Sequence, residues 1–446
     1  MGKYFGTDGV RGVANDDLSP ELAFKIGRAV AEKLNDDTKL MVIGKDTRLS
    51  GDMLESALIA GLNSAGFSVI RLGVIPTPAV AFLTRYYKAS AGAVISASHN
   101  PGEFNGIKFF GSTGFKLPDA LEDEIEELID NPDTEFYPTH EKIGKVYDRP
   151  EASRIYIDFL KSTISESFDG IKIALDCGHG ATYKIAPVLF KELGADVQVI
   201  NTEPDGMNIN LNCGSTNPEI IKTVVSKTNA DMGFSFDGDG DRLIAVDETG
   251  EIMDGDHLIA ACALHLKEQG KLKNNGVVGT VMTNIGFDEC MKKHGVDVFK
   301  ANVGDRYVLE MMVKEGFIIG GEQSGHIIFL EDNTTGDGIL SALKVAEMKI
   351  HQNKKMSELN QLMTTYPQVL VNAKVKKKNQ MKYVDDEEIQ NEIKKLEEKM
   401  SGQGRVLIRP SGTEPLVRVM LEGQDQEQMN RDAVVLAELI SNKYNH

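Results

Sequence analysis

The chain has 446 residues, of which 41% are hydrophobic and 26% are charged, a composition typical of folded proteins with several hydrophobic cores. At about 150 residues per domain, this length predicts roughly three domains. The 67 acidic and 49 basic residues give a formal net charge of −18, which argues against general nucleic-acid binding because that requires a basic face. An anionic small ligand remains compatible with this charge where basic residues gather locally.

The cysteines Cys177, Cys213, Cys262 and Cys290 are scattered along the chain. Without a CxxC spacing they fit neither a zinc site nor a small disulfide framework. The N-terminus lacks the apolar segment of a signal peptide, and no run of 18 apolar residues is long enough to span a membrane. We therefore expect a protein of the reducing cytoplasm that has no membrane partner.

Strand and helix patterns alternate from residue 40 onward. Apolar strand patterns at 40–44, 67–73 and 91–96 alternate with helical patterns at 51–66 and 78–88. Such alternation predicts a parallel, doubly wound sheet with helices on its faces.

One sequence pattern recurs along the chain. It consists of a helical pattern, a glycine and then a strand pattern. The glycines are Gly66, Gly194 and Gly295, each at the position of a helix C-cap. We interpret the recurrence as three related α/β units. The polar loops at 131–140 and 247–256 are predicted to end the first and second units. After residue 365 a basic strand, a charged helix, two adjacent strands and a final helix predict a smaller α+β unit.

The sequence SASHNP, residues 96–101, follows a strand pattern. Pro101 removes a backbone donor and keeps Asn100 out of the α region, so the strand must end here. The segment is either a plain turn or a place where a serine hydroxyl is presented as a nucleophile. Because neighbouring side chains of an extended chain point apart, we expect no catalytic pair between Ser98 and His99.

The sequence DGDGDR, residues 237–242, places Asp237, Asp239 and Asp241 at alternate positions between two apolar strand patterns. Ionised carboxylates about 4 Å apart would repel by roughly 4 kcal/mol per pair at an effective dielectric of about 20. A bound cation would relieve this repulsion, and hard oxygen ligands suit Mg²⁺. We therefore predict a metal-binding loop rather than a solvated acidic turn.

Two further loops are weaker signals when taken alone. In GGEQSGH, residues 320–326, Glu322 and Ser324 offer an acceptor and a donor for sugar hydroxyls. In RPSGTEP, residues 409–415, Arg409, Ser411 and Thr413 surround a glycine, and Arg418 lies on the following strand. Guanidinium groups, hydroxyls and exposed backbone amides favour a phosphate-binding loop, although both sequences also suit ordinary turns.

With FGTDGVRG at residues 5–12, these motifs occur in an order that resembles the α-D-phosphohexomutase family over essentially the whole chain. The resemblance implies three related mixed α/β domains and a smaller C-terminal α+β domain around a central cleft. The implied domains are 1–145 with a phosphoserine loop, 146–250 with a metal-binding loop, 251–365 with a sugar-binding loop, and 366–446 with a phosphate-binding loop.

The resemblance also implies roles for individual residues. Ser98 would carry the transferable phosphoryl group and, with Asp237, Asp239 and Asp241, would hold one Mg²⁺ per chain. The other implied residues are Arg11, His99, Lys108, Arg242 and His326 around the reacting oxygens, Glu322 and Ser324 at the sugar, and Arg409, Ser411, Gly412, Thr413 and Arg418 at the phosphate that does not react. Either Lys108 or His326 could carry the proton, and the sequence does not choose between them.

The activity implied by the resemblance is the interconversion of glucosamine 6-phosphate and glucosamine 1-phosphate through a bisphosphate, in the supply of UDP-N-acetylglucosamine for the bacterial cell wall. A homodimer is compatible with it, and the source of the first phosphoryl group on Ser98 stays open. Three alternatives remain: a mutase for glucose or mannose phosphates, a phosphatase with Asp237 as nucleophile, and a non-catalytic, metal-dependent sugar-phosphate binding protein.

Overall fold

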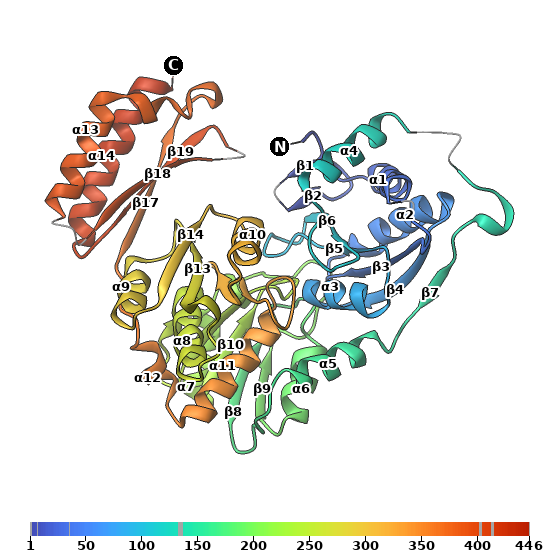
Figure 1. The fold of residues 1–446 in the computed structure, drawn as a ribbon, viewed down its shortest axis with the longest axis horizontal. Coiled ribbons are helices and arrows are strands. Elements are labelled where there is room, and N and C mark those ends of the chain that lie inside the picture. Colours follow the sequence, from blue (N-terminus) through green and yellow to red (C-terminus); the bar gives the residue numbers. More distant parts are fainter. Residues whose placement is uncertain are drawn as a thin grey trace. The chain divides into compact units, whose positions relative to one another are not determined.

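The computed structural model describes residues 2–6, 8–34, 36–132, 137–400, 404–411 and 414–445. The chain divides into two compact units, Met1–Thr283 with His294–Leu362, and Asn284–Lys293 with Met363–His446. The first unit contains a seven-stranded, a five-stranded and a four-stranded sheet, and the second contains a three-stranded sheet. Figure 1 shows the helices and strands of each unit.

The seven-stranded sheet has the strand order β1-β2-β6-β5-β3-β4-β7. Its strands are β1 (Phe5–Gly6), β2 (Gly9–Val13), β3 (Leu40–Lys45), β4 (Ser68–Val74), β5 (Ala91–Ile95), β6 (Phe104–Gly111) and β7 (Val146–Asp148). The neighbouring helices are α1 (Pro20–Lys33), α2 (Gly51–Ser64), α3 (Thr77–Tyr86) and α4 (Asp119–Asp130). β3, β4, β5 and β7 run parallel, whereas β6 is antiparallel to β5 and β2. The sheet is therefore mixed rather than purely parallel.

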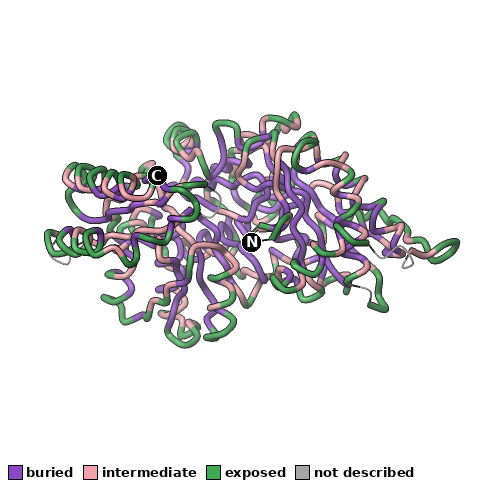
Figure 2. The backbone as a smooth tube through the Cα atoms, turned by 90° about the horizontal axis from the view of Figure 1, so that it is seen from above, coloured by how far each residue is buried: buried purple, intermediate pink, exposed green. Residues whose placement is uncertain are grey.

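Helices α1, α2 and α4 bury apolar side chains in one core with β3 and β5, including Ile26, Leu58 and Ile125. α1 and α2 pack closely because Gly61 has no side chain. A Cβ atom at Gly61 would overlap the carbonyl oxygen of Phe24 on α1. The strands of this core are buried along most of their length (Figure 2).

The five-stranded sheet has the order β12-β11-β10-β8-β9 and the four-stranded sheet the order β14-β13-β15-β16. Their strands are β8 (Lys172–Asp176), β9 (Asp196–Ile200), β10 (Met232–Phe236), β11 (Leu243–Asp247), β12 (Ile252–Met253), β13 (Gly276–Thr280), β14 (Asp297–Ala301), β15 (Ile319–Gly321) and β16 (Ile327–Phe329). The helices of this part are α5 (Ala152–Ser162), α6 (Ile185–Glu192), α7 (Glu219–Thr228), α8 (Gly255–Glu268), α10 (Asp305–Glu315), α11 (Gly338–Gln352) and α12 (Met356–Asn360).

The same strand arrangement occurs in all three sheets of the first unit. The pairs β3–β4, β8–β9 and β13–β14 are parallel, and a further strand pairs parallel with the first strand of each pair. That further strand is followed by an antiparallel partner in β5–β6, β10–β11 and β15–β16. Gly66, Gly194 and Gly295 have φ of +88°, +97° and +64°, as helix C-cap glycines do. The predicted repeat of three α/β units is confirmed.

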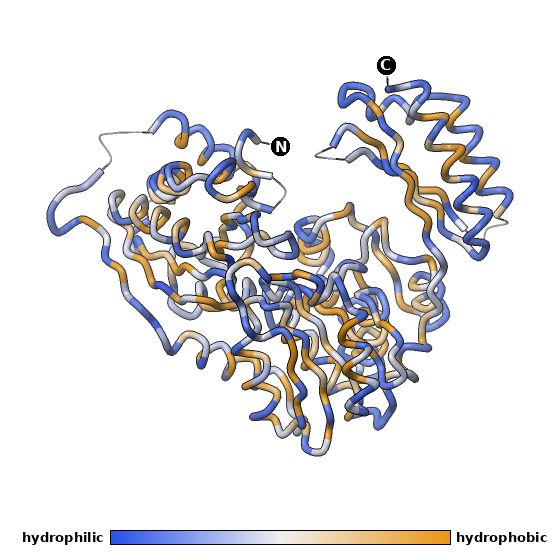
Figure 3. The backbone as a smooth tube through the Cα atoms, turned by 180° about the vertical axis from the view of Figure 1, so that it is seen from behind, coloured by the Kyte–Doolittle hydropathy of each residue, from blue (hydrophilic) through white to orange (hydrophobic). Residues whose placement is uncertain are grey.

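The second unit packs helices onto a three-stranded antiparallel sheet of order β17-β19-β18. Its elements are α9 (Ile285–Lys293), β17 (Gln368–Lys374), α13 (Glu387–Lys399), β18 (Arg405–Pro410), β19 (Leu416–Glu422) and α14 (Gln426–Tyr444). The strands are largely hydrophobic, whereas α13 is largely hydrophilic and buries only Ile389 and Leu396 (Figure 3). This is the predicted α+β unit. Short 3₁₀ turns span His140–Lys142, Gly214–Thr216, Lys273–Asn275, Lys377–Asn379 and Lys382–Asp385.

Three details differ from the sequence-based expectations. β5 ends at Ile95, so Ser96 lies outside the strand. β17 ends at Lys374, and Lys377 and Lys378 lie in a 3₁₀ turn instead of extending the basic strand. β7 follows the loop at 131–140 and still pairs with β4, because an edge strand can join a sheet after a long connection.

Candidate active site

Three of the predicted loops occupy the same position in their respective sheets. The loops that contain Ser98, the acidic DGDGDR sequence and His326 each connect a strand of the parallel set to its antiparallel partner. The side chains of these loops meet in the first unit. Ser98 Oγ donates to Asp237 Oδ2 at 2.8 Å, and His326 Nδ1 lies 3.5 Å from Asp241 Oδ2. Chain segments far apart in sequence therefore form one polar site.

Ser98 has a backbone conformation that the strand pattern did not predict. Its φ is +51°, in the left-handed region, and the residue is only 1% exposed. Its N–H donates to Ser96 Oγ at 2.9 Å. Because the chain is not extended here, Ser98 Oγ comes within 3.4 Å of His99 Nδ1. The expectation that these two side chains point apart is wrong.

The aspartates Asp237, Asp239 and Asp241 are all buried, and one possible ligand atom of each lies within 4.8 Å of the others. Asp239 Oδ1 and Asp241 Oδ1 have no hydrogen-bond partner within the described part of the chain. Burial, together with repulsion from Asp241 and Asp239, raises the pKa of Asp237 well above its usual value. A buried set of oxygen atoms that repel one another fits a hard divalent cation.

Asp239 and Asp241 also contact groups from the other two sheets. Thr77 Oγ1 donates to Asp239 Oδ2 at 2.7 Å, and Lys108 Nζ lies 3.0 Å from the same oxygen. Burial acts to raise the pKa of Asp241, but the hydrogen bond and charge of His326 outweigh it and keep that pKa well below the usual range. Groups from the first and third sheets therefore contact the acidic loop.

The structure adds three ionised residues that the sequence analysis did not select. Asp8 contacts Lys108 at 3.0 Å and Lys116 at 2.5 Å. Lys116 also contacts Asp305 at 2.5 Å. Asp305 lies 3.7 Å from His326 Nε2. These contacts connect Lys108 to His326 through alternating charges.

Asp8 belongs to the FGTDGVRG motif and could have been selected from it. Lys116 and Asp305 gave no signal of their own, because they meet only in the folded chain.

Arg11 and Arg242 lie at the edge of this network. Arg11 is on β2 and donates to Asp8. The backbone N–H of Arg242 donates to Asp237 Oδ1 at 3.1 Å, and its Nε lies 3.9 Å from Asp241 Oδ1. Two guanidinium groups thus stand beside the carboxylates, where they can neutralise an added anion.

His326 and Lys108 differ in their readiness to exchange a proton. The N–H of Gly336 donates to His326 Nε2 at 3.1 Å, which assigns the ring proton to Nδ1, the nitrogen facing Asp241. Burial lowers the pKa of His326, but Asp241 and Asp305 outweigh this effect and raise it. For Lys108, burial lowers the pKa, but Asp239 and Asp8 outweigh it and raise the pKa above its usual value. Lys108 therefore keeps its proton and its positive charge.

In the third loop, Glu322 is the residue held in place by hydrogen bonds. Its Oε1 accepts from the N–H of Gly304 at 2.9 Å. Gln323 Nε2 donates to Asp254 Oδ2 at 3.2 Å, and Ser324 is exposed. The loop leaves polar atoms available to a ligand. Its hydrogen bond with Gly304 brings the segment that precedes α10 next to Glu322.

The predicted phosphate loop belongs to the second unit and is described by itself. Arg409 on β18 is directly opposite Arg418 on β19, and Ser411 Oγ accepts from the N–H of Glu414 at 3.2 Å. Gln380, another residue that the sequence did not reveal, donates to the carbonyl oxygens of Ser411, Glu414 and Leu416. Gly412 and Thr413 lie outside the described residues.

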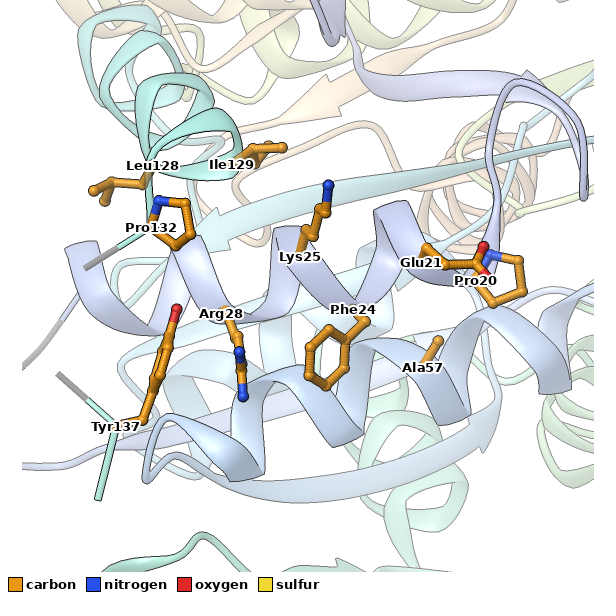
Figure 4. A pocket seen from close by; sticks show the side chains of 10 residues that line it. All are labelled: Pro20, Glu21, Phe24, Lys25, Arg28, Ala57, Leu128, Ile129, Pro132 and Tyr137. Atoms are coloured by element: carbon orange, nitrogen blue, oxygen red, sulfur yellow. The ribbon is translucent and has the colours of Figure 1, made fainter. Parts of the chain in front are cut away.

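Two cavities in the first unit lie differently with respect to these groups. One of about 480 Å³ is lined by α1, α2, α4 and Tyr137, with Arg28 stacked 3.9 Å from the Tyr137 ring (Figure 4). None of its lining residues belongs to the motif loops. The second, of about 380 Å³, is lined by Lys116, Asp305 and His326 together with apolar residues of α10. The second cavity therefore adjoins the candidate active site.

Comparison with protein families matches four models in chain order. They are described as phosphoglucomutase/phosphomannomutase alpha/beta/alpha domain I (residues 2–136), domain II (154–250), domain III (254–366) and the C-terminal domain (370–439). The chain belongs to the phosphoglucomutase/phosphomannomutase family. The resemblance to α-D-phosphohexomutases inferred from the motifs is confirmed, together with the predicted fold class.

Curated relatives share more than half of the sequence. A phosphoglucosamine mutase of Finegoldia magna is 62% identical and covers 99% of each chain. One of Alkaliphilus oremlandii is 58% identical and covers 100% of each chain.

Solved structures support the fold alone. They include a family protein of Burkholderia thailandensis (23% identity, TM-score 0.82, covering 99% of this chain and 98% of that chain). A putative phosphomannomutase of Thermus thermophilus is 24% identical with a TM-score of 0.78 and 98% of both chains covered.

Proposed function

We propose that the protein interconverts glucosamine 6-phosphate and glucosamine 1-phosphate. The observation that carries the proposal is the contact between the buried Ser98 hydroxyl and Asp237, in a triad that keeps two carboxylate oxygens without a hydrogen-bond partner among the described residues. The phosphoglucosamine mutases that are 62% and 58% identical over nearly the whole chain support the amino sugar as substrate.

The cation proposed for the triad is Mg²⁺, one per chain, held by Asp237, Asp239, Asp241 and an oxygen on Ser98. When bound, Mg²⁺ would neutralise charge on the transferring phosphoryl group. The oxygen-only donor set supports this choice. Lys108 and Arg242 add fixed positive charge beside the same oxygens, which is where negative charge gathers during transfer. Arg11 adds a further positive charge beside Asp8.

The proposed reaction has two transfers. A sugar hydroxyl attacks the phosphorus of phosphoserine 98, the new sugar O–P bond forms, and the bond between Ser98 Oγ and phosphorus breaks. The product is glucosamine 1,6-bisphosphate. After this intermediate has turned around in the site, Ser98 Oγ attacks its other phosphoryl group and the second sugar phosphate leaves. Charge neutralisation and positioning dominate such transfers.

The proton of the attacking hydroxyl needs an acceptor, and the contacts bear on the choice between Lys108 and His326. A Lys108 that stays protonated can neutralise charge on the transferring phosphoryl group but cannot accept a proton. His326 would accept at Nε2 only after releasing the N–H of Gly336. We propose Lys108 as a fixed positive charge, and His326 as the group that accepts the proton of the attacking hydroxyl and returns it to the leaving oxygen. His99, at 3.4 Å from Ser98 Oγ, is proposed to orient the serine.

Substrate positions are proposed for the remaining predicted residues. Glu322 and Ser324 would contact the sugar and its C2 ammonium, because a carboxylate accepts hydrogen bonds and attracts a cation. The phosphate that does not react is assigned to Arg409, Ser411, Gly412, Thr413 and Arg418. The proposed domain ranges are 1–145, 146–250, 251–365 and 366–446.

The cellular setting belongs to the same proposal. It places the enzyme in the cytoplasm, as a supplier of glucosamine 1-phosphate for UDP-N-acetylglucosamine and the cell wall, without a nucleic-acid partner. A homodimer is compatible with this proposal. Among the described helices, none has the length and apolar content that a membrane crossing requires.

Intact-mass and peptide mass spectrometry test the phosphoserine. We expect an addition of about 80 Da localised to Ser98 in the active enzyme. Phosphate on Asp237 would instead favour the phosphatase alternative, and active enzyme without any phosphate would reject the mechanism.

Side-by-side kcat/KM values for glucosamine 1-phosphate, glucose 1-phosphate and mannose 1-phosphate test the substrate. We expect the amino sugar to be preferred. An equal or higher value for either neutral sugar would overturn that assignment and leave the transfer mechanism intact.

A further inference from the structure

Arg48 lies beneath the loop that carries Ser98, and its side chain is fully buried. It follows β3 in the chain. The sequence pattern there indicates only that an apolar strand ends, and it gives no sign of a role for Arg48. Its guanidinium group donates to the carbonyl oxygens of Ser98 at 2.9 Å and Asn100 at 2.7 Å. It also donates to the carbonyl oxygens of Phe104 at 3.0 Å and of Pro101. One side chain thus binds three backbone carbonyls of the Ser98 loop and one at the start of β6.

Asp46 fixes the orientation of this guanidinium group. Arg48 Nε donates to Asp46 Oδ2 at 2.8 Å, and the Arg48 N–H donates to Asp46 Oδ1 at 2.9 Å. Ser96 Oγ donates to the same Asp46 Oδ2 at 2.6 Å and accepts from the N–H of Ser98 at 2.9 Å. The peptide units on both sides of Ser98 are therefore tied, directly or through Ser96, to one buried ion pair.

This arrangement stabilises a backbone conformation that serine adopts rarely. A non-glycine residue with φ near +51° has a strained backbone, which persists only where the surrounding structure imposes it. Asn210, from the second sheet, reinforces the loop by donating to the carbonyl oxygens of Ser98 at 2.9 Å and Asn100 at 3.2 Å. The left-handed turn brings Ser98 Oγ to Asp237.

We propose that Arg48, oriented by Asp46, is a positioning residue for phosphoryl transfer. It holds the Ser98 loop in the left-handed turn so that the serine oxygen faces the acidic loop, and it contacts neither the substrate nor the reacting oxygen. This inference rests on the proposed role of Ser98. The contacts require a planar group with several N–H donors, which lysine cannot supply.

The test compares Arg48→Lys and Arg48→Met with wild type. We expect both variants to lose at least about 100-fold in kcat, since small misplacements of reacting groups cost about that much. KM for the sugar phosphate should stay within about threefold, because the loops assigned to the sugar and the distal phosphate are untouched. A third variant, Arg48→Ala, tests chemical rescue. Guanidinium added at low, non-denaturing concentration should partly restore its kcat, whereas methylammonium should not.

Lys45→Met serves as the matched control. Lys45 is a buried cation at the end of β3 that pairs with Asp52 and Glu55, and within the described part of the chain its side chain has no hydrogen bond or ion pair with the Ser98 loop. We expect this variant to lose thermal stability and to keep kcat once the folded fraction is counted. If Arg48→Lys behaves like Lys45→Met, with kcat per folded molecule unchanged, the inference is wrong.

The phosphorus resonance of phosphoserine 98 separates failure of this inference from failure of the proposed function. Wild type should give one narrow ³¹P line, and the Arg48 variants a shifted or broadened one. Absence of any phosphoserine in wild type would reject the proposed function itself. A wild-type line that stays unchanged in folded Arg48→Lys would reject the positioning role alone.

Discussion

The two units present their polar loops in different ways. In the first unit, Ser98 donates to Asp237, and Lys108 pairs with Asp239; all four residues are nearly or fully buried. In the second unit, Arg409 and Arg418 are half-buried and lie side by side across two strands. Charges that are fixed before the ligand arrives suit chemistry, because little reorganisation is left for the transition state. Half-exposed arginines suit the proposed phosphate contacts, which must form and break again in each turnover.

The comparison predicts its largest effect at the serine. Ser98→Ala removes the oxygen that accepts and donates the phosphoryl group, and we expect kcat to fall by at least about 10⁴-fold. Steady-state turnover of glucosamine 1-phosphate measures this loss. The hydroxyl of Ser56 on α2 donates to the carbonyl oxygen of Asp52, and Ser56→Ala should retain wild-type kcat. Residual Ser98→Ala turnover above one hundredth of wild type would assign the chemistry to another group.

Asp239→Asn tests whether the acidic loop acts through its charge. The amide keeps the shape but removes one negative charge from the triad, and we expect kcat to fall by roughly 10²–10³-fold. Turnover should be measured across a Mg²⁺ titration, with Asp231→Asn, which caps the start of β8, as the control. Full activity of Asp239→Asn, or of wild type in excess chelator, would make the triad a structural feature.

Arg409→Ala probes the other side of the comparison, since a binding loop should affect KM more than kcat. Loss of a charge-assisted phosphate contact costs about 1.5–3 kcal/mol, which predicts a KM raised about 10- to 100-fold. We expect kcat to stay within about threefold. Arg431→Ala, at an exposed position of α14, provides the control. A large fall in kcat with KM unchanged would place Arg409 among the groups that act on the transition state.

The smallest expected effect is on the pH dependence of stability, through the buried carboxyl of Glu122 in the first unit. Burial raises the pKa of Glu122 to about 7, although Arg306 Nη2 lies 3.1 Å away. A raised pKa stabilises the fold fully below the unfolded value near 4.5, and this contribution is lost as pH rises through about 7. We expect Glu122→Gln to remove on the order of 1 kcal/mol of pH dependence between pH 5 and pH 8.

Thermal melts at several pH values would show this as a smaller fall in Tm for Glu122→Gln than for wild type. The exposed Glu398→Gln should leave the wild-type pH dependence intact. Parallel pH curves for wild type and Glu122→Gln would show that this carboxyl does not titrate in that range.

The sequence predicted the parts of the fold and site that are local in the chain. Alternating patterns located most helices and strands, and the glycines at 66, 194 and 295 marked the repeat because a C-cap needs positive φ. The motif loops carried Ser98 and the acidic triad. What those residues do stays a prediction.

Long-range contacts could not be predicted in the same way. Lys116 and Asp305 are separated by 189 positions, and no local pattern pairs them. The left-handed turn at Ser98 was also missed, because it depends on the buried Arg48 rather than on the sequence of the loop itself.

The equivalent placement of three loops on three similar hairpins has a consequence for how such a protein can diversify. Each hairpin belongs to a different sheet. The side chains at positions 322, 323 and 324 can therefore change without altering the strands that present Ser98 or Asp237. The proposed assignment of Glu322 and Ser324 to the sugar then implies that selectivity among sugars can be inherited, or engineered, separately from phosphoryl chemistry. Exchanging this one hairpin between relatives is the smallest graft that should move preference from one sugar to another.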